Sequence, residues 1–230
     1  MANNERKIMA KTPVGTAIYP HLLDVDKYQL DNHGKQEYNT QLRLSPSPER
    51  DTFQALIDST AAEALAECVA TLSSGDGKSK ALAKSMETHV PYTFAVDDDG
   101  DDTDDIVFKF KCAAGGTDKN GKDWEKELPV FDSLGQPLKG EARKAIRLWG
   151  GSRISVAAQV MPFAATGLKK AGVSLRLQAV QIIEAKGGGE NADVFGFGVV
   201  EGGFKAESFA AHAVTPTPEV EDEYVDDIPF

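Results

Sequence analysis

Cysteine is scarce in this chain, and so are long apolar runs: its 230 residues include two cysteines, Cys68 and Cys112. Two cysteines are too few for a disulfide framework or a four-cysteine zinc site, so we expect buried free thiols in a reducing cytoplasm. No apolar run approaches the roughly 18 residues that a membrane-spanning helix needs. Because the first residues also lack an apolar signal core, we expect neither secretion nor association with a membrane.

Motifs for catalysis are missing as well. The stretch 76–79 lacks the earlier glycine of a phosphate-binding loop, because Leu72 stands in its place. The stretch 196–198 lacks the third glycine of a dinucleotide fingerprint, since that position is Glu201. The acidic run 97–105 does not match the spacing of a calcium-binding loop, and the four histidines lack ligand spacing. We therefore expect no cofactor, no metal and no enzymatic activity.

Positive charge is concentrated locally, although the chain as a whole has a net charge of −11. Residues 206–230 contain seven acids and no lysine or arginine, and residues 97–105 contain another seven acids. Between residues 106 and 176, by contrast, 13 bases stand against six acids. This asymmetry favours a body that binds a polyanion and an acidic tail that takes part in interactions.

Apolar and polar residues alternate along several stretches, which is the periodicity of β-strands with one buried face. We predict strands at residues 13–19, 35–44, 92–96, 106–112, 124–131, 153–161 and 173–179. The alternation changes parity near residues 180–182, as it does at a bulge or a strand end. Residues 97–105 carry too much negative charge for a strand, so we predict a solvated hairpin loop there.

One long helix is predicted among these strands. Ser47 is suited to cap it and Pro48 to occupy its first position, and apolar residues then recur at helical spacing over residues 48–73. A weaker helix is predicted at about 78–87. Short strands, glycine-rich bends and a single long helix together indicate a mainly β fold built around a small barrel.

Composition divides the chain into three parts. Residues 1–189 carry the strand pattern and are predicted to form the folded body. Residues 190–205 contain three phenylalanines and are predicted to form an additional hairpin or arm. From residue 206 to residue 230 aromatic residues are few and acid is abundant, so we expect a disordered tail.

Lysines and aromatic residues in the body suit a single-stranded nucleic acid, which needs cations along its backbone and flat rings for its bases. Lys109 and Lys111 share one strand face, while the phenylalanines that alternate with them are predicted to lie in the core. Trp149 and Phe163 stand at strand ends, where they either stack on bases or form the rim of the core. Further candidate cations are Arg153, Lys169, Lys170 and Arg176.

The C-terminus combines acids with an apolar end: its last residues are Asp226, Asp227, Ile228, Pro229 and Phe230. An apolar terminal residue that carries its own carboxylate and follows acids suits a partner pocket with a basic rim. This ending closely resembles the C-terminal peptide of bacterial single-stranded DNA-binding proteins, which recruits replication and repair enzymes. The resemblance implies that the tail binds a polymerase, a helicase or a nuclease.

The body resembles the single-stranded DNA-binding proteins of phage replication, in five stretches that occur in the same order. These stretches are residues 108–112, 130–135, 149–153, 160–163 and 173–178. The resemblance implies an OB fold, that is, a five-stranded barrel with one long inserted α-helix and an acidic tail. It also implies DNA contacts at Lys35 and Tyr38, in addition to the lysines, arginines and aromatic residues named above.

The function that this resemblance implies is the coating of single-stranded DNA, without strong sequence preference, in phage DNA replication, recombination and repair. Such a protein acts in the cytoplasm of the host bacterium. Two alternatives stay open: an acidic adaptor that binds only proteins through its tail, and a metal-dependent phosphodiesterase that uses the acidic run 97–105. The sequence also leaves the oligomeric state open, self-association included.

Overall fold

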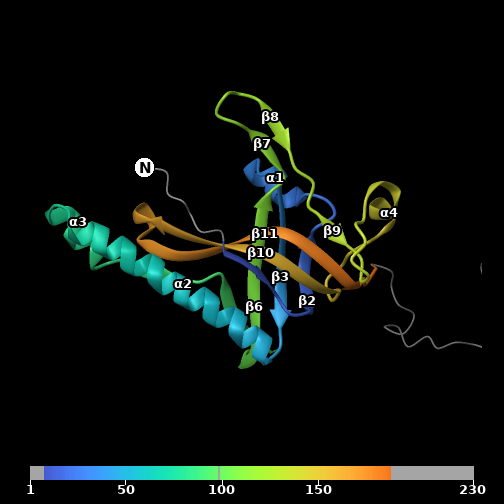
Figure 1. The fold of residues 1–230 in the computed structure, drawn as a ribbon, viewed down its shortest axis with the longest axis horizontal. Coiled ribbons are helices and arrows are strands. Elements are labelled where there is room, and N and C mark those ends of the chain that lie inside the picture. Colours follow the sequence, from blue (N-terminus) through green and yellow to red (C-terminus); the bar gives the residue numbers. More distant parts are fainter. Residues whose placement is uncertain (1–7, 98, 188–230) are drawn as a thin grey trace, which may run out of the picture. The chain divides into compact units, whose positions relative to one another are not determined.

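The fold is that of a computed structural model, which describes residues 8–97 and 99–187. Five strands form a closed barrel in the order β10, β2, β3, β6, β11 and back to β10 (Figure 1). Their bounds are β2 Gly15–His21, β3 Glu37–Leu44, β6 Asp102–Ala113, β10 Arg153–Ala165 and β11 Lys170–Glu184. The prediction of a mainly β fold with a five-stranded barrel is therefore confirmed.

Apolar side chains fill the barrel, and over residues 108–112 of β6 they alternate with exposed lysines. Phe108 and Phe110 are at most 1% exposed, as predicted for the inner face of β6. Leu42 on β3 and Leu177 on β11 are fully buried in the same core. Because successive side chains of a strand point to opposite faces, the polar residues between these positions face outward.

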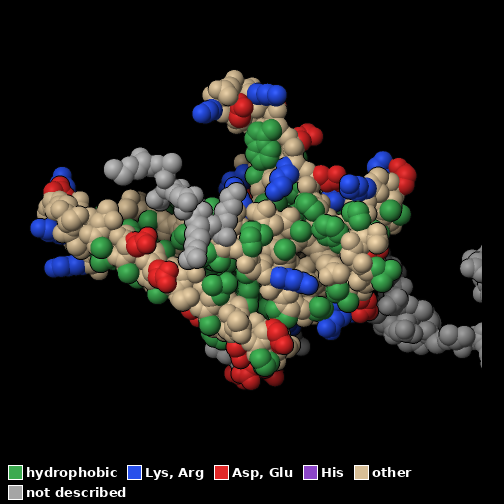
Figure 2. All heavy atoms as spheres, in the orientation of Figure 1, with side chains coloured by type: hydrophobic (Ala, Val, Ile, Leu, Met, Phe, Trp, Pro, Cys, Tyr) green, Lys and Arg blue, Asp and Glu red, His purple; other side chains and the backbone are tan. Residues whose placement is uncertain are grey.

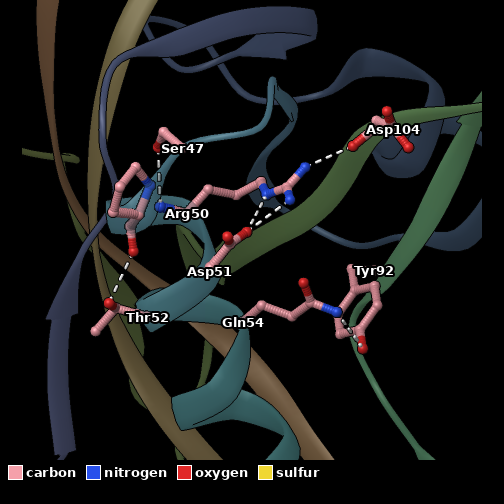
Figure 3. Close-up of polar contacts among 8 residues, drawn as sticks. Ser47, Arg50, Asp51, Thr52, Gln54, Tyr92 and Asp104 are labelled. Atoms are coloured by element: carbon pink, nitrogen blue, oxygen red, sulfur yellow. Dashed lines mark hydrogen bonds and ion pairs between the residues drawn. The ribbon is translucent and has the colours of Figure 1, made fainter.

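The long helix α2 (Pro48–Ser73) begins and ends at the predicted residues. At its start the Oγ of Ser47 accepts a hydrogen bond of 3.1 Å from the backbone N–H of Arg50 (Figure 3). The ring of Phe53 packs edge-on against Phe108, with 5.1 Å between the ring centroids. Since Phe53 contacts an inner-face residue, the helix extends the barrel core and leaves the outer face of β6 open.

The prediction of a loop over residues 97–105 is wrong in its second half. Strand β6 already begins at Asp102, and it pairs there with β5 (Tyr92–Val96). The backbone carbonyl of Asp104 accepts a hydrogen bond from the guanidinium of Arg50, which ties the strand to α2 (Figure 3). Before Ile106 this strand pairs with β5 but not with β3, so one side of it is an open edge, where charged side chains are tolerated. Figure 2 accordingly shows acidic side chains gathered around the start of β6.

Several short elements surround the barrel. The ones that the sequence patterns do not predict are β1 (Ile8–Lys11), α1 (Lys27–His33), β4 (Glu87–His89), β7 (Gly115–Thr117), α4 (Gly140–Ala145) and a 3-10 turn (Thr166–Leu168). The weaker helix predicted at 78–87 is shorter, as α3 (Gly77–Ala83). The strand predicted at 124–131 divides into β8 (Asp123–Glu125) and β9 (Val130–Phe131), because β8 turns back to pair with β7.

Strands β10 and β11 form a long hairpin whose pairing shifts twice along its length: Arg153 pairs with Glu184 and Ile154 with Ile182, which leaves Ile183 as an extra residue. Ala157 pairs with Ala179 and Ala158 with Leu177, which leaves Gln178 as an extra residue. The predicted change of parity is thus confirmed as an irregular pairing, although the two extra residues lie just before and just after the predicted residues 180–182.

The C-terminal segments predicted as an arm (190–205) and an acidic tail (206–230) lie outside the described residues. The five terminal residues assigned to partner binding lie there too. In the part of the chain that the structure describes, no helix is both long and apolar enough to cross a membrane.

Candidate nucleic-acid interface

A groove of about 930 Å³ lies over the outer face of β3 and β6. One wall is formed by α1 and the end of β2, and the other by the segment from β4 to β5. Its lining includes Tyr19, His21, Asp26, Tyr28, Asn39, Gln41, His89, Lys109 and Lys111. Cations, amides and aromatic rings thus share one open surface, which also includes the carboxylates of Asp24, Asp26 and Glu37.

Lys109 and Lys111 lie on the floor of this groove because of the register of β6. Lys109 pairs with Gln41 and Lys111 with Asn39 across the antiparallel β3–β6 ladder. Both lysines are exposed, whereas the phenylalanines that alternate with them are buried. The predicted placement of the two lysines on one outward face is therefore confirmed, and their contact with DNA stays a prediction.

Polar side chains continue as one row across the neighbouring strands. Arg176 on β11 stands beside Lys111 in the parallel β6–β11 pairing, and Gln159 on β10 pairs with Arg176. In the other direction, Asn39 pairs with Lys111, and His21 on β2 pairs with Asn39. The barrel thus brings two separately predicted cations, Lys111 and Arg176, into adjacent positions on its outer surface.

Two exposed tyrosine rings, which the sequence patterns do not single out, line the wall formed by β2 and α1. Tyr19 is 72% exposed and Tyr28 is 66% exposed. Tyr19 has a φ of 48°, a left-handed conformation that is rare for a bulky residue, and the β2–β3 pairing is interrupted between Ile18 and His21. Such an irregularity re-aims a side chain, in this case into the groove. In the sequence, the only sign of this irregularity in β2 is the Tyr19-Pro20 pair at the end of a strand pattern.

Asp26 organises the end of the groove near α1. Its Oδ1 accepts from the backbone N–H of Gln29 at 3.2 Å, capping α1, and its Oδ2 accepts from Nδ2 of Asn39 at 2.7 Å. Burial raises the pKa of Asp26, but these two hydrogen bonds and the nearby His21 together bring the pKa below its ordinary value. Because a carboxylate only accepts, the Asn39 amide turns its nitrogen to Asp26 and keeps its oxygen free to accept.

His89 lies in the opposite wall of the groove and contacts Phe163, which does not itself line the groove. Their rings contact edge to face at 5.5 Å, on either side of Gly172, which pairs with both residues. Burial lowers the pKa of His89, and the charges of Lys170 and Lys109 lower it further. Phe163 is half-buried in this contact, so its ring is neither a core residue nor a fully open stacking surface.

The sequence from residue 19 to residue 185, which includes the whole lining of this groove, matches the profile of one protein family. The family is described as "Single-stranded DNA-binding protein, Bacteriophage T7". The chain belongs to this family. The resemblance noted from five short stretches of the body is therefore confirmed over most of the chain.

Two curated relatives are single-stranded DNA-binding proteins of phages. The chain is 33% identical to the protein of Enterobacteria phage T3 over 111 residues, which are 47% of this chain and 45% of that protein. It is 31% identical to the protein of Escherichia phage T7 over 143 residues, which are 62% of this chain and 57% of that protein. The chain thus spans about half the length of the curated relatives it matches.

A solved structure supports the fold of the family. It is the crystal structure of gp2.5, a single-stranded DNA-binding protein encoded by bacteriophage T7, which superposes with a TM-score of 0.63 at 24% identity. The superposition covers 87% of this chain and 99% of that chain. The OB fold that the sequence implied is therefore confirmed.

The DNA contact that the family resemblance implies for Tyr38 is wrong. Its side chain is 8% exposed and lies on the inner face of β3, opposite Cys112 on β6. Burial also raises the pKa of its hydroxyl. Strand parity explains the error, because Tyr38 shares its face with Leu42 while Asn39 and Gln41 face the groove. A base cannot stack on a ring inside the barrel.

Four other predicted DNA-binding residues are exposed and lie away from the groove: Lys35, Trp149, Arg153 and Lys169. Lys170 is also exposed and does not line the groove, but its charge acts on His89 in the groove wall. Trp149 is 56% exposed in the turn before β10, where its backbone N–H donates to the carbonyl of Lys186, so it is not a core residue. Arg153 pairs with Thr16 on β2 and with Glu184 on β11. The structure therefore does not bring these four residues together with Lys109 and Lys111, and their DNA contacts stay predictions.

Proposed function

We propose that this chain binds single-stranded DNA, without strong sequence preference, along the groove over β3 and β6. The observation that carries the proposal is the presence in one groove of Lys109 and Lys111 with the exposed rings of Tyr19 and Tyr28. Lysines neutralise phosphates whatever the base, and aromatic rings stack on every base. Membership of a family described by single-stranded DNA binding supports the same ligand.

In this proposal the phosphates lie along Lys109, Lys111 and Arg176, which neighbouring strands place next to one another. The bases turn toward Tyr19 and Tyr28, and each stacking contact contributes about 1–3 kcal/mol. The remaining predicted residues are candidates for contacts with flanking nucleotides: Lys35, Trp149, Arg153, Phe163, Lys169 and Lys170. The groove then supplies affinity, while sequence preference stays weak.

We further propose that the protein acts in phage DNA replication, recombination and repair, in the cytoplasm of the host bacterium. Residues 1–189 form the DNA-binding body and residues 190–205 an arm, while the acidic tail 206–230 recruits a polymerase, helicase or nuclease. The tail would contact its partner protein through its final residues, Asp226, Asp227, Ile228, Pro229 and Phe230. The seven acids of the tail also compete with DNA for the cations of the groove, because a tethered segment acts at an effective concentration of about millimolar.

Titration of the full-length chain with oligothymidine and with mixed-sequence oligonucleotides over a range of salt concentrations tests the DNA-binding proposal. We expect similar affinities for both, falling linearly with salt on a log–log plot, with a slope of about −0.7 for each phosphate contact. Absence of oligonucleotide binding would favour the acidic adaptor instead. Magnesium-dependent cleavage that is lost when the aspartates of 97–105 become asparagine would favour the phosphodiesterase. Among the described residues, no three His, Cys, Asp or Glu side chains are placed to hold a metal ion.

Two deletions separate the roles proposed for the tail. Deleting residues 206–230 removes seven acids and no base, so DNA binding strengthens, most of all at low salt. Deleting Phe230 alone keeps all seven acidic side chains, so DNA affinity hardly changes while partner binding weakens. If a replication or repair enzyme of the host binds the Phe230 deletion as well as it binds the intact chain, the tail acts through charge alone.

A further inference from the structure

We infer that the bound strand continues past the groove into a second hollow beside the β7–β8 hairpin, where Trp124 stacks on an additional base. This inference rests on the proposed function, because it extends the path of the same DNA strand. The second hollow has a volume of about 440 Å³. The residues that matter in its lining are Trp124, Lys126, Gln159, Met161, Arg176 and Gln178.

The two hollows are joined by a pair of cations. Lys111 lines the groove, and Arg176 lines the second hollow. The two residues are partners in the parallel pairing of β6 with β11, so they occupy neighbouring positions on the outer surface. Neighbouring strands lie about 4.8 Å apart, which is a short step for a polynucleotide backbone. A strand that leaves the groove at Lys111 therefore meets Arg176 next.

The charge of the second hollow suits phosphate. Its lining contains the cations Lys126 and Arg176, and no carboxylate stands among the described residues that line it. Cys112 also lines the hollow and is buried: burial raises the pKa of its thiol, the charges of Lys126 and Arg176 lower it, and the charge of Glu37 raises it. Both positive charges, opposed by the single negative charge of Glu37, therefore act on one residue of the lining.

The indole of Trp124 is held in place and still partly open. It is 42% exposed, and it packs over Gly116, its partner in the β7–β8 pairing. A Cβ at Gly116 would lie 3.6 Å from Nε1 of Trp124, in ordinary contact, so the ring rests directly on the backbone there. A ring whose orientation is already fixed loses little conformational entropy when a base stacks on it.

The hairpin that carries Trp124 is tied down at both ends, although it projects from the barrel (Figure 1). At its base the backbone N–H of Lys126 donates to the carbonyl of Ala114 at 2.6 Å. At its tip Oδ1 of Asp118 accepts from the backbone N–H groups of Asn120 and Lys122 at 2.8 and 2.9 Å. These bonds keep the hairpin in one shape, so Trp124 stays beside the hollow.

Two tryptophans in the whole chain make the inference measurable, because each can be observed alone. The Trp149→Phe variant reports Trp124 fluorescence, and the Trp124→Phe variant reports Trp149. Each full-length variant is titrated with oligothymidines of about 4 and about 16 nucleotides, the limits of the usual site size of one OB fold. We expect the 16-mer, but not the 4-mer, to quench Trp124, because only the longer strand extends beyond the groove.

Affinities of further variants complete the test. Trp124→Ala should weaken binding of the 16-mer roughly 5- to 100-fold and leave the 4-mer unchanged, whereas Trp124→Phe should keep most of the affinity. Lys126→Gln should make the salt slope shallower by about 0.7 for the 16-mer only. Leu134→Ala is the matched control, since Leu134 is 83% exposed and lines neither hollow.

The outcomes separate this inference from the proposed function. If the wild-type chain binds the 16-mer while Trp124→Ala binds it equally well and Trp124 is not quenched, the inference fails and the proposed function stands. If Trp124→Ala weakens both lengths equally, the ring belongs to the groove or supports the fold, and the continued path is also overturned. If the wild-type chain binds neither oligothymidine, the proposed function fails and the inference fails with it.

Discussion

Lys111 and Arg176 stand side by side on the neighbouring parallel strands β6 and β11, and both side chains are exposed. The closure of the barrel creates this adjacency, since the two residues come from distant parts of the sequence. Asn39 on β3 and Gln159 on β10 flank them. The two positive charges are therefore the centre of a row of polar side chains that runs across four neighbouring strands. A polyanion that follows this row crosses the strands instead of running along one of them.

The rings of Tyr19 and Tyr28 should contribute affinity without contributing charge. Replacing either by alanine should weaken oligothymidine binding roughly 5- to 100-fold, because about 1–3 kcal/mol of stacking is lost per base. The salt slope should stay as in the wild type, since stacking releases few counterions. Phe94→Ala is the control, because Phe94 is 56% exposed on β5 and does not line the groove. Unchanged affinity in both tyrosine variants would remove these rings from the DNA path.

Gly172 should be intolerant of even one methyl group. A Cβ at this position would overlap the backbone carbonyl of His89, on the β4 strand that pairs with β11. Gly172→Ala should therefore destabilise the fold by about 1–3 kcal/mol or more in urea unfolding, through overpacking against backbone. Gly77→Ala provides the comparison, because no atom lies within 4 Å of a Cβ there and the residue is helical. Equal stability of the two variants would mean that β4 is not held against β11 as described.

The protonation of His89 should make the stability of the fold depend on pH, and its pKa should change when phosphate binds nearby. Its pKa lies below the ordinary 6.5, because of burial first and then the charges of Lys170 and Lys109. The unfolded chain therefore binds this proton more readily, so His89 makes the fold less stable as the pH falls below about 6.5. Phosphates placed near Lys170 and Lys109 would offset their charges and raise the pKa of His89.

Ring resonances of His89, followed by NMR through a pH titration with and without oligothymidine, measure both effects. We expect a depressed pKa in the free protein and an upward shift with DNA. The His89→Gln variant identifies the resonance and should lose less stability on acidification than the wild type. A pKa that DNA leaves unchanged would place the phosphates away from this wall of the groove.

The long helix and the lysine face of β6 could be predicted from the sequence because both depend on local patterns. Ser47 caps α2, and helical periodicity fixes its length. Strict alternation puts Lys109 and Lys111 outside and their phenylalanine neighbours inside. These features need no knowledge of what lies elsewhere in the chain.

The rest of the site depends on how distant segments meet. Tyr19 reaches the groove through an irregularity in β2 and a positive φ, which alternation cannot reveal. Tyr38 lies inside the barrel, and a family resemblance names a residue without saying which face of the strand it occupies. The sequence pattern predicts one strand over residues 124–131, whereas Trp124 lies in β8, which pairs with the glycine-rich segment before it, β7.

The central claim, that DNA phosphates lie along the outer face of β6, is tested most directly by the salt dependence of oligothymidine binding to a Lys109→Gln/Lys111→Gln variant. Lys78→Gln/Lys80→Gln is the matched control, because it removes the same charge from exposed lysines of α3 that do not line the groove. We predict weaker binding to every oligonucleotide and a log–log slope that is shallower by about 1.4, which is two contacts of about 0.7 each, with the control unchanged. A folded Lys109→Gln/Lys111→Gln variant with the wild-type slope would contradict the account.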